Sequence, residues 1–367
     1  MNNNFFYNKI YKDTKNIFFH KIIGFDHENV FLFYDKLIDL QFIIAIHSTV
    51  LGPAIGGLRI FNYSSIEYAL IDVLNLSKSM TYKASISGLK LGGAKAIIIG
   101  NLDKSKMKIK FLLKKYGSFI NYLNGYYITA SDLNVSLDFL KFVSNETKYV
   151  LGLPLYCNGS GNSSFTTAFG VYIGMKAAVK EVFGNDSLKN KKILLEGVGN
   201  VGKYLINYLC KEGAKVYIID VLILDLLDII NKYPIKIINI SDINNLDFDI
   251  YSPCALGFTI NNNTIKKMNF KIIAGSANNQ FESIKNSRTL FNNNILHVPD
   301  FLISSGGLIN VYFELYGNYN RNNVYSKIEN IYNISLDIFK KSKFLKISPQ
   351  EVAINDVNKK INYKKLL

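Results

Sequence analysis

Two lysines and one aspartate lie among glycines in the first half of the chain, where they could carry out proton chemistry on a small ligand. Residues 80–95 read MTYKASISGLKLGGAK and contain Lys83 and Lys95, and Asp132 ends the segment YITASD. Glycines at this density let backbone and side chains crowd a small molecule. A lysine acts as a base at neutral pH only where burial or a neighbouring cation lowers its pKa. Composition alone favours ordinary solvated lysines at both positions.

A glycine-rich turn carries the second chemical signal. Residues 193–220 read ILLEGVGNVGKYLINYLCKEGAKVYIID, and Gly197, Gly199 and Gly202 fit the pattern G-x-G-x-x-G between a predicted strand and a predicted helix. The first glycine would permit a tight turn, the second a close approach of the backbone to a pyrophosphate, and the third close packing of the helix on the sheet.

The residue that ends the following strand indicates which dinucleotide binds. Asp220 lies 18 residues after Gly202, where a carboxylate can accept a hydrogen bond from a ribose hydroxyl and would repel a 2′-phosphate. The pattern therefore predicts NAD rather than NADP, with the pyrophosphate at the N-terminal end of the helix. The predicted cofactor-binding residues of this segment are Gly197, Val198, Gly199, Asn200, Val201, Gly202 and Asp220.

These groups need a scaffold of strands and helices. In the first 150 residues the pattern predicts strands at 42–48 and 96–100 and a helix at 65–79, with Ser64 or Ser65 as its N-cap. Strand and helix then alternate as in a doubly wound parallel sheet, and the chain is largely helical from about residue 311. The predicted elements of the alternating zone are helices 168–182, 201–210 and 221–233 and strands 192–195, 216–219, 236–238, 250–251 and 272–274.

Length and composition limit the remaining possibilities. A chain of 367 residues with 49% hydrophobic residues predicts a globular protein of two domains. No apolar run reaches the ~18–20 residues of a membrane span, and the first residues lack a secretory pattern. Three scattered cysteines favour neither a disulfide framework nor a metal site. We therefore expect a cytoplasmic protein with no membrane partner and no metal.

The net charge of +15 could suggest a nucleic-acid partner. The lysines are spread along the whole chain, however, and the abundance of Asn, Lys, Ile, Tyr and Phe is what an A+T-rich coding sequence produces. A protein that binds nucleic acid would concentrate its basic residues on one element with interleaved aromatic residues. We expect no nucleic-acid partner.

The order of several motifs resembles the Glu/Leu/Phe/Val dehydrogenase family. These motifs are GPAIGGLR (residues 52–59), MTYK (80–83), GLKLGGAK (88–95), YITASD (127–132), EGVGNVG (196–202), CALG (254–257), AGSANNQ (274–280) and PDFLISSGGLINV (299–311). The resemblance implies an N-terminal α/β substrate-binding and catalytic domain (residues 1–150) and a Rossmann-type NAD domain (151–325). It also implies C-terminal helices (326–367) that pack on the first domain, and a homo-oligomer. The implied reaction is the reversible oxidative deamination of an L-amino acid to a 2-oxo acid and ammonia.

The resemblance also assigns roles to residues. Lys83 would hold the substrate α-carboxylate, Lys95 would be the catalytic lysine, and Asp132 would carry protons to and from the amino group. Thr167 and Asn279 would line the nicotinamide side of the site, with Asn278 taking the second role if the alignment shifts by one residue. The implied substrate-binding set is Lys83, Gly56, Ile55, Met80, Ala130, Leu308 and Val311.

Two apolar residues indicate which amino acid reacts. Glutamate-specific members carry lysine at the position of Ile55 and serine at that of Val311, so here a glutamate side chain would be buried without a counter-charge. Ala130, which tends to be glycine in phenylalanine-specific members, favours leucine, valine or isoleucine, although a hydrophobic pocket discriminates weakly between such neighbours. A phenylalanine-type enzyme and a non-catalytic dinucleotide-binding subunit are the alternatives.

Some positions depart from the family pattern. Ala94 replaces a glycine, Ser304 and Ser305 replace Asn-Ala, and Ser163 and Phe165 replace two prolines. These changes remove no proton-transfer group, but we expect that they could loosen the site.

Overall fold

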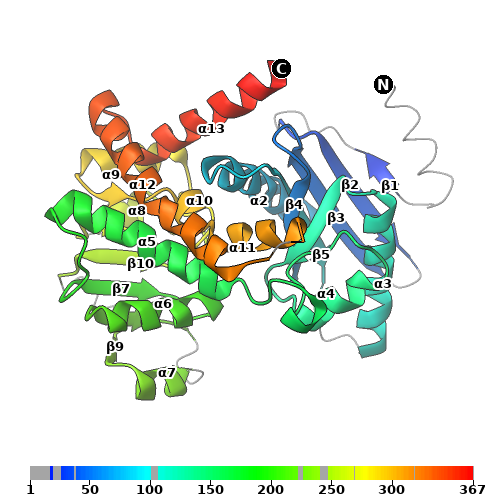
Figure 1. The fold of residues 1–367 in the computed structure, drawn as a ribbon, viewed down its shortest axis with the longest axis horizontal. Helices are drawn as coiled ribbons and strands as arrows, with labels where there is room; N and C mark the ends of the chain where they lie inside the picture. The colour runs from blue at the N-terminus through cyan, green and yellow to red at the C-terminus, as the bar shows by residue number, and fades with distance from the viewer. Residues whose placement is uncertain are drawn as a thin grey trace. The chain divides into compact units, whose positions relative to one another are not determined.

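The computed structural model describes residues 17–19, 26–36, 39–100, 106–221, 226–239, 247–267, 269–317 and 319–366 (Figure 1). The chain divides into two compact units, residues 1–162 with 363–367 and residues 163–362. Each unit contains a six-stranded sheet. The predicted class, a two-domain α/β fold with one parallel Rossmann-type sheet, is confirmed.

The sheet of the first unit is mixed and has the strand order β1-β2-β3-β5-β4-β6. Strands β1, β2, β3 and β5 pair antiparallel, whereas β4 runs parallel to both of its neighbours, β5 and β6. The strands are β1 Ile17–Phe19, β2 Asn29–Asp35, β3 Leu40–Ser48, β4 Ala54–Phe61, β5 Gly92–Ile99 and β6 Tyr127–Ser131. Strand β4 therefore lies between two strands that follow it in the sequence.

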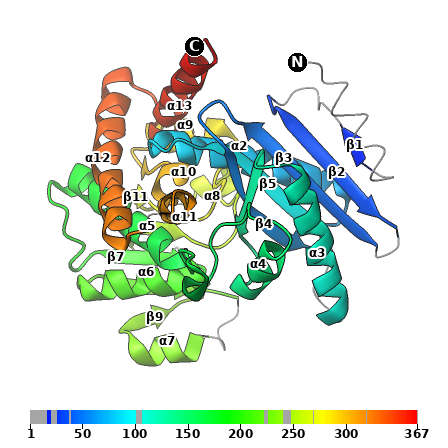
Figure 2. The same cartoon turned by 45° about the vertical axis from the view of Figure 1, so that its right-hand side comes forward.

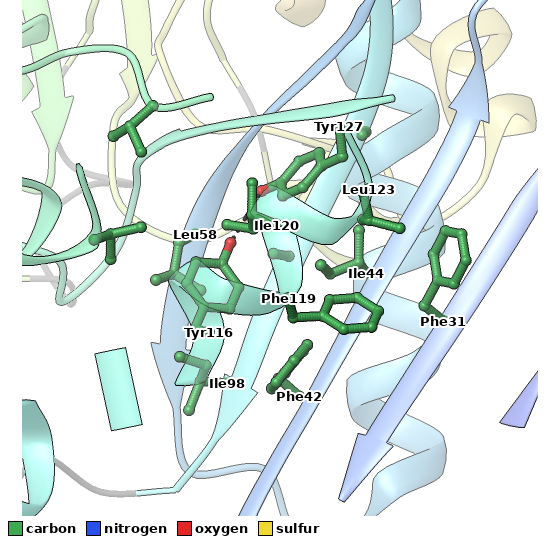
Figure 3. Close-up of a cluster of buried hydrophobic side chains, with 14 of the residues drawn as sticks. Phe31, Phe42, Ile44, Leu58, Ile98, Tyr116, Phe119, Ile120, Leu123 and Tyr127 are labelled. Carbon is green, nitrogen blue, oxygen red and sulfur yellow. Dashed lines mark hydrogen bonds between the residues drawn. The ribbon is translucent and has the colours of Figure 1, made fainter. Parts of the chain in front are cut away.

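Helices cover both faces of this sheet. Helix α2 (Ile66–Ile86) packs over β3 and β5, and the side chain of its N-cap Ser65 accepts a hydrogen bond from the Tyr68 amide. Helices α3 (Lys106–Tyr122) and α4 (Leu137–Ser144) cover the other face, where buried aliphatic and aromatic side chains form a core cluster (Figure 3). Since side chains alternate along a strand, each strand contributes to both faces.

The second unit has six parallel strands in the order β12-β11-β10-β7-β8-β9. This is the doubly wound order 6-5-4-1-2-3, in which ligands bind where the order reverses, here between β7 and β10. The strands are β7 Lys192–Glu196, β8 Lys215–Ile219, β9 Ile235–Ile237, β10 Ile250–Pro253, β11 Ile272–Ile273 and β12 Leu296–His297. They are apolar runs because helices cover both faces.

The helices of the second unit pack against one another as well as against its sheet. Helix α5 contacts both α6 and α12, and α8 contacts α9 (Figure 2). The helices are α5 Ser164–Phe183, α6 Asn200–Lys211, α7 Leu227–Lys232, α8 Asn262–Ile265, α9 Ile284–Asn292, α10 Asp300–Ile303, α11 Gly306–Leu315, α12 Arg321–Leu345 and α13 Pro349–Leu366, of which the residues from 363 on are counted with the first unit. A 3-10 turn, η1 (Leu155–Cys157), precedes them in the first unit.

The structure extends two elements that matter for the site. Helix α2 continues to Ile86 and so includes Met80 and Lys83, and β5 begins at Gly92 and so includes Lys95. The sequence pattern ended the helix early and began the strand late, because polar residues and glycine are uncommon in regular structure. The predicted helix 221–233 is shorter, since α7 begins at Leu227, and residues 222–225 lie outside the described part.

The division into units differs from the predicted boundaries. The first unit ends at residue 162 rather than 150, and α12 packs on α5 within the second unit. The predicted packing of residues 326–367 on the first domain stays a prediction. Among the residues that the structure describes, no helix has the length and apolar character that crossing a membrane requires.

Candidate active site

The structure brings Lys95 and Asp132 together. Lys95 Nζ lies 2.8 Å from Asp132 Oδ2, and the lysine side chain is 5% exposed while that of the aspartate is 24% exposed. Lys95 comes from the middle of β5, and Asp132 directly follows β6. Strand β4 separates β5 from β6 in the sheet, so the two side chains meet across it. A buried amine and a partly accessible carboxylate in direct contact can exchange a proton with a bound ligand.

Sequence reasoning missed two further charged groups of this site. Arg59 Nε donates to Asp132 Oδ2 at 2.9 Å, and its Nη1 donates to Asp72 Oδ2 at 2.9 Å. Arg59 lies on β4 and Asp72 on α2. The available signal was the GPAIGGLR motif that contains Arg59, but the partners of the arginine are distant in sequence. The site is thus a four-residue network of two cations and two anions.

Burial and neighbouring charges shift the pKa values of this network. Burial lowers the pKa of Lys95, Asp132 opposes that shift, and the Arg59 cation adds to it. Burial would raise the pKa of Asp132, but Lys95 and Arg59 together hold it well below its usual range. Asp132 is therefore an anion throughout the physiological range, and Lys95 is closer to neutrality than an exposed lysine would be.

Three predicted residues lie on one face of the first sheet. Ile55 pairs with Gly93 and with Ile128, and each of these two lies two residues from Lys95 or Ala130 along its own strand. Because side chains two residues apart share a face, Ile55, Lys95 and Ala130 face the same way. Ile55 is 1% exposed and Ala130 is 7% exposed. On this face the buried amine of Lys95 therefore lies on the same side as two apolar side chains.

Helix α2 covers this same face and contributes Met80 and Lys83. A Cβ built on Gly93 would lie 2.1 Å from the Thr81 amide nitrogen, so the helix lies directly on the strand at this glycine. Met80 is half-buried, and Lys83, in the last turn of α2, is buried. The glycine of β5 is what lets α2, the helix that carries Met80 and Lys83, approach the sheet at Thr81.

Close packing explains the residue types at positions 56 and 94. A Cβ on Gly56 would lie 1.8 Å from the Ala94 carbonyl oxygen, and the Tyr127 hydroxyl donates to the Gly56 carbonyl at 2.7 Å. The Ala94 methyl joins the core cluster on the α3 side, together with Tyr127 (Figure 3). Ala94 therefore faces away from Lys95, and its extra methyl fills the core rather than the site.

In the second unit the three fingerprint glycines have different surroundings. Gly197 has φ +91° and its Cβ would lie 2.7 Å from the Ala255 Cβ, which only a glycine turn tolerates. A Cβ on Gly202 would lie 2.4 Å from the Gly197 carbonyl oxygen, whereas a Cβ on Gly199 would meet no atom within 4 Å. The open backbone at Gly199, at the start of α6, fits a pyrophosphate group.

The remaining predicted residues of this fingerprint lie in the same turn. Asp220 directly follows β8, and its Oδ2 accepts a hydrogen bond from the Val198 amide at 2.6 Å, so the carboxylate also holds the turn. Asn200 and Val201 form the first turn of α6. The residues present fit an NAD cofactor, because the turn, the open backbone and the carboxylate are all at the end of β7.

The other second-unit residues lie on α5, α11 and the loop after β11. The Thr167 hydroxyl donates to the Ser163 carbonyl at 3.0 Å. Asn279 has φ +51°, and its carbonyl accepts the Phe258 amide at 2.8 Å. Leu308 and Val311 are buried on α11. Lining of a nicotinamide or of a substrate side chain by these four residues stays a prediction.

The departures from the family pattern are accommodated locally. The Phe165 ring contacts Arg321, whose guanidinium lies 4.8 Å from the ring centroid. The Ser304 hydroxyl donates to the Asp300 carbonyl at 2.6 Å. Ser305, by contrast, is fully buried, and its hydroxyl has no hydrogen-bond partner among the described residues. Within the described residues, no group of three or more His, Cys, Asp or Glu side chains is arranged to hold a metal ion.

Residues 35–149 match the family described as Glu/Leu/Phe/Val dehydrogenase, dimerisation domain, and residues 159–221 and 227–345 match Glutamate/Leucine/Phenylalanine/Valine dehydrogenase. Leucine dehydrogenase of Bacillus cereus is 42% identical over 325 residues, which cover 89% of this chain and 88% of that protein. Leucine dehydrogenase of Geobacillus stearothermophilus is 44% identical over 308 residues, 84% of this chain and 83% of that protein.

Relatives with aromatic substrates in their names are also similar. Phenylalanine dehydrogenase of Lysinibacillus sphaericus is 38% identical over 348 residues, covering 94% of this chain and 90% of that protein. The crystal structure of L-tryptophan dehydrogenase from Nostoc punctiforme superposes with a TM-score of 0.75 at 37% identity, covering 93% of this chain and 98% of that chain.

Proposed function

The chain belongs to the Glu/Leu/Phe/Val dehydrogenase family and is an NAD-dependent amino-acid dehydrogenase, and we propose that its substrate is a branched-chain L-amino acid. Leucine is the first candidate, and valine and isoleucine are expected to react as well. The products of the oxidative direction are the 2-oxo acid, ammonia and NADH. The observation that carries this proposal is Ile55, buried on the same face of the first sheet as Lys95.

The burial of Ile55 argues against a glutamate substrate. A side-chain carboxylate beside Ile55 would lose its hydration without gaining a counter-charge, which costs several kcal/mol. The apolar Val311 of the second unit supports the same preference. Ala130, with a methyl group where a glycine would leave more room, favours an aliphatic over an aromatic side chain. The substrate classes of the relatives leave an aromatic amino acid as the alternative.

The three polar residues of the first unit would divide the chemistry among them. Lys83 would hold the substrate α-carboxylate. Lys95, in its neutral form, would take a proton from the water that attacks the imino carbon, and Asp132 would carry a proton between the amino nitrogen and solvent. The lowered pKa of Lys95 suits its role as a base, and Asp132, held as an anion, offers an acceptor oxygen to the amino group.

The cofactor would bind the second unit. The amide groups around Gly199 and the start of α6 would hold the pyrophosphate, Asp220 would accept a hydrogen bond from the adenosine ribose, and Thr167 and Asn279 would contact the nicotinamide. When bound, NAD supplies the acceptor for the substrate α-hydride. The protein's contribution is orientation and the exclusion of water.

We further propose a homo-oligomer in the cytoplasm that acts in branched-chain amino-acid metabolism. The match of residues 35–149 to a dimerisation domain supports an oligomer, and Cys157, Cys210 and Cys254 are free thiols, as a reducing compartment would keep them. Light scattering during size-exclusion chromatography tests the oligomer, and a mass equal to one chain would contradict it.

The substrate proposal is tested by NADH oxidation with ammonia and a panel of 2-oxo acids. We expect 4-methyl-2-oxopentanoate to have the highest kcat/KM, followed by 3-methyl-2-oxobutanoate, with 2-oxoglutarate far below. An Ile55→Lys variant should raise the rate with 2-oxoglutarate relative to the branched acids, and Ile55→Leu is the matched control. A wild-type preference for 2-oxoglutarate or for phenylpyruvate would refute the proposal.

A further inference from the structure

Arg59 connects the two halves of the charged network in the first unit. Its Nε bonds Asp132 and its Nη1 bonds Asp72, both at 2.9 Å. The arginine side chain is 18% exposed, and it extends from β4 toward a carboxylate that follows β6 and another on α2. One guanidinium group thereby joins two strands and a helix around Lys95.

The type of residue at position 59 is itself informative. Among the 43 basic residues of the chain, three are arginines. A planar guanidinium can donate in two fixed directions at once, whereas a lysine ammonium is a point charge on a flexible stem. Position 59 uses both directions, one for each carboxylate.

Asp72 is held in place from its other side. The Tyr63 hydroxyl donates to Asp72 Oδ2 at 2.5 Å, and burial together with this carboxylate raises the pKa of Tyr63 well above its usual value. Tyr63 therefore remains a donor at every pH at which the enzyme could work. Asp72, which is 20% exposed, is fixed by α2, by Arg59 and by Tyr63.

We propose that Arg59, anchored by Asp72 and Tyr63, is a positioning residue that holds the Asp132 carboxylate in its reactive orientation and keeps a second cation beside Lys95. This inference rests on the proposed roles of Lys95 and Asp132. Arg59 acts through Asp132 and needs no contact with the substrate. Without it, Asp132 would have Lys95 as its remaining cationic partner in this network, and the pair would form a closed ion pair.

The charges around Lys95 give the inference a pH signature. The charged groups that act on Lys95 are Asp132, Arg59 and Asp72. Two of the elements packed against β5 also carry titratable residues, Lys83 on α2 and His47 on β3. Asp132 and Asp72 raise the pKa of Lys95, whereas Arg59 lowers it. Removal of the Arg59 charge should therefore raise the pKa of Lys95. The neutral, active form of Lys95 would then become populated at higher pH.

The test compares Arg59→Gln with Arg59→Lys in the full-length enzyme, using the 2-oxo acid that the wild type aminates fastest. For Arg59→Gln we expect kcat to fall about 100-fold, as for a misplaced catalytic group, a small change in KM, and a shift of the rising limb of the pH–rate profile to higher pH. Arg59→Lys should return the rising limb of the pH–rate profile to its wild-type position, because it restores the positive charge. Its kcat should stay about 10-fold below that of the wild type, because one ammonium group cannot hold both carboxylates.

A milder variant covers the possibility that Arg59→Gln does not fold. Tyr63→Phe removes one hydroxyl from the half-buried anchor and should lower kcat about 3- to 10-fold without changing KM, following the loss of one charge-assisted hydrogen bond. The matched controls are Tyr68→Phe on the exposed face of α2 and Arg288→Lys, whose exposed guanidinium pairs with Glu351. Both controls should retain wild-type kinetics.

Three results would overturn the inference. They are an Arg59→Gln enzyme with the wild-type kcat and pH profile, a limb that moves to lower pH, and a Tyr63→Phe enzyme indistinguishable from Tyr68→Phe. The result of the 2-oxo acid panel bears on the substrate proposal and not on the role of Arg59. A preference for phenylpyruvate would overturn the branched-chain proposal alone, since the variants are compared on whichever acid the wild type prefers.

Discussion

Replacement of Asp132 by asparagine removes the one carboxylate that both Lys95 and Arg59 contact, at 2.8 and 2.9 Å. Asparagine keeps the shape of the side chain but carries no charge and cannot accept a proton from the substrate amino group. Loss of a general acid–base group lowers rates by about 10²–10⁴-fold. We expect kcat of Asp132→Asn to fall within this range, with a smaller change in KM.

The same substitution has a calculable effect on stability. It leaves two cations, Lys95 and Arg59, without the carboxylate between them. Loss of a buried charged partner costs about 3–5 kcal/mol, and since 24% of the Asp132 side chain is exposed, water offsets part of this cost. We expect the free energy of unfolding to fall by about 1–3 kcal/mol, as measured by urea denaturation.

The pH profile of the residual activity distinguishes loss of the Asp132 charge from simple misfolding of the variant. Asp132 raises the pKa of Lys95, so its removal should shift the rising limb of the residual activity to lower pH, opposite to the shift expected for Arg59→Gln. NADH absorbance during reductive amination between pH 6 and 11, a range from about 4 units below to just above the ordinary lysine pKa of ~10.4, reports this limb. The control is Asp138→Asn, an exposed aspartate in the first turn of α4. A limb that stays in place or moves upward would refute the reasoning.

The glycine fingerprint predicts two opposite results. Gly199→Ala meets no atom within 4 Å, so it should fold normally and weaken NADH binding at least 10-fold in fluorescence titrations. Gly202→Ala would clash with the Gly197 carbonyl at 2.4 Å and should cost about 1–3 kcal/mol of stability, and equal behaviour of the two variants would contradict these assignments. Burial lowers the pKa of His297 from 6.5 to about 4. Between these pH values the unfolded chain binds a proton that the native chain does not, so stability should fall by up to about 3 kcal/mol as the pH drops from 6.5 to 4. In urea denaturation, the free energy of unfolding of His297→Gln should depend less steeply on pH than that of the wild type. An unchanged dependence would exclude His297 as the source of the pH effect. Ser65→Ala should lower the melting temperature slightly, by the equivalent of about 0.5–1 kcal/mol, through loss of the α2 N-cap, and a melting temperature equal to the wild type would mean that solvent caps the helix.

The dinucleotide fingerprint was predictable because it is local. The strand, the three glycines, the helix and the strand that ends in Asp220 are contiguous in sequence, so their spacing fixes their geometry with little help from the rest of the chain. The alternation of apolar strands and helices likewise predicted the doubly wound sheet, since strands buried on both faces must be apolar throughout. The predicted element ends were less accurate. Glycines concealed the start of β5, and polar residues concealed the last two turns of α2.

The sequence by itself determined the chemical groups, two lysines and an aspartate among glycines, and the family that their motifs resemble. Which of them meet was decided by tertiary structure. The sheet order β5-β4-β6 differs from the sequence order and places β4 between the strands of Lys95 and Asp132. Arg59 of β4 therefore lies between them, and α2 adds Asp72 from above the same face. Parallel pairing through crossovers is set by the packing of distant segments, so local spacing could identify the lysine and the aspartate but could not place the arginine that joins Asp132 to Asp72.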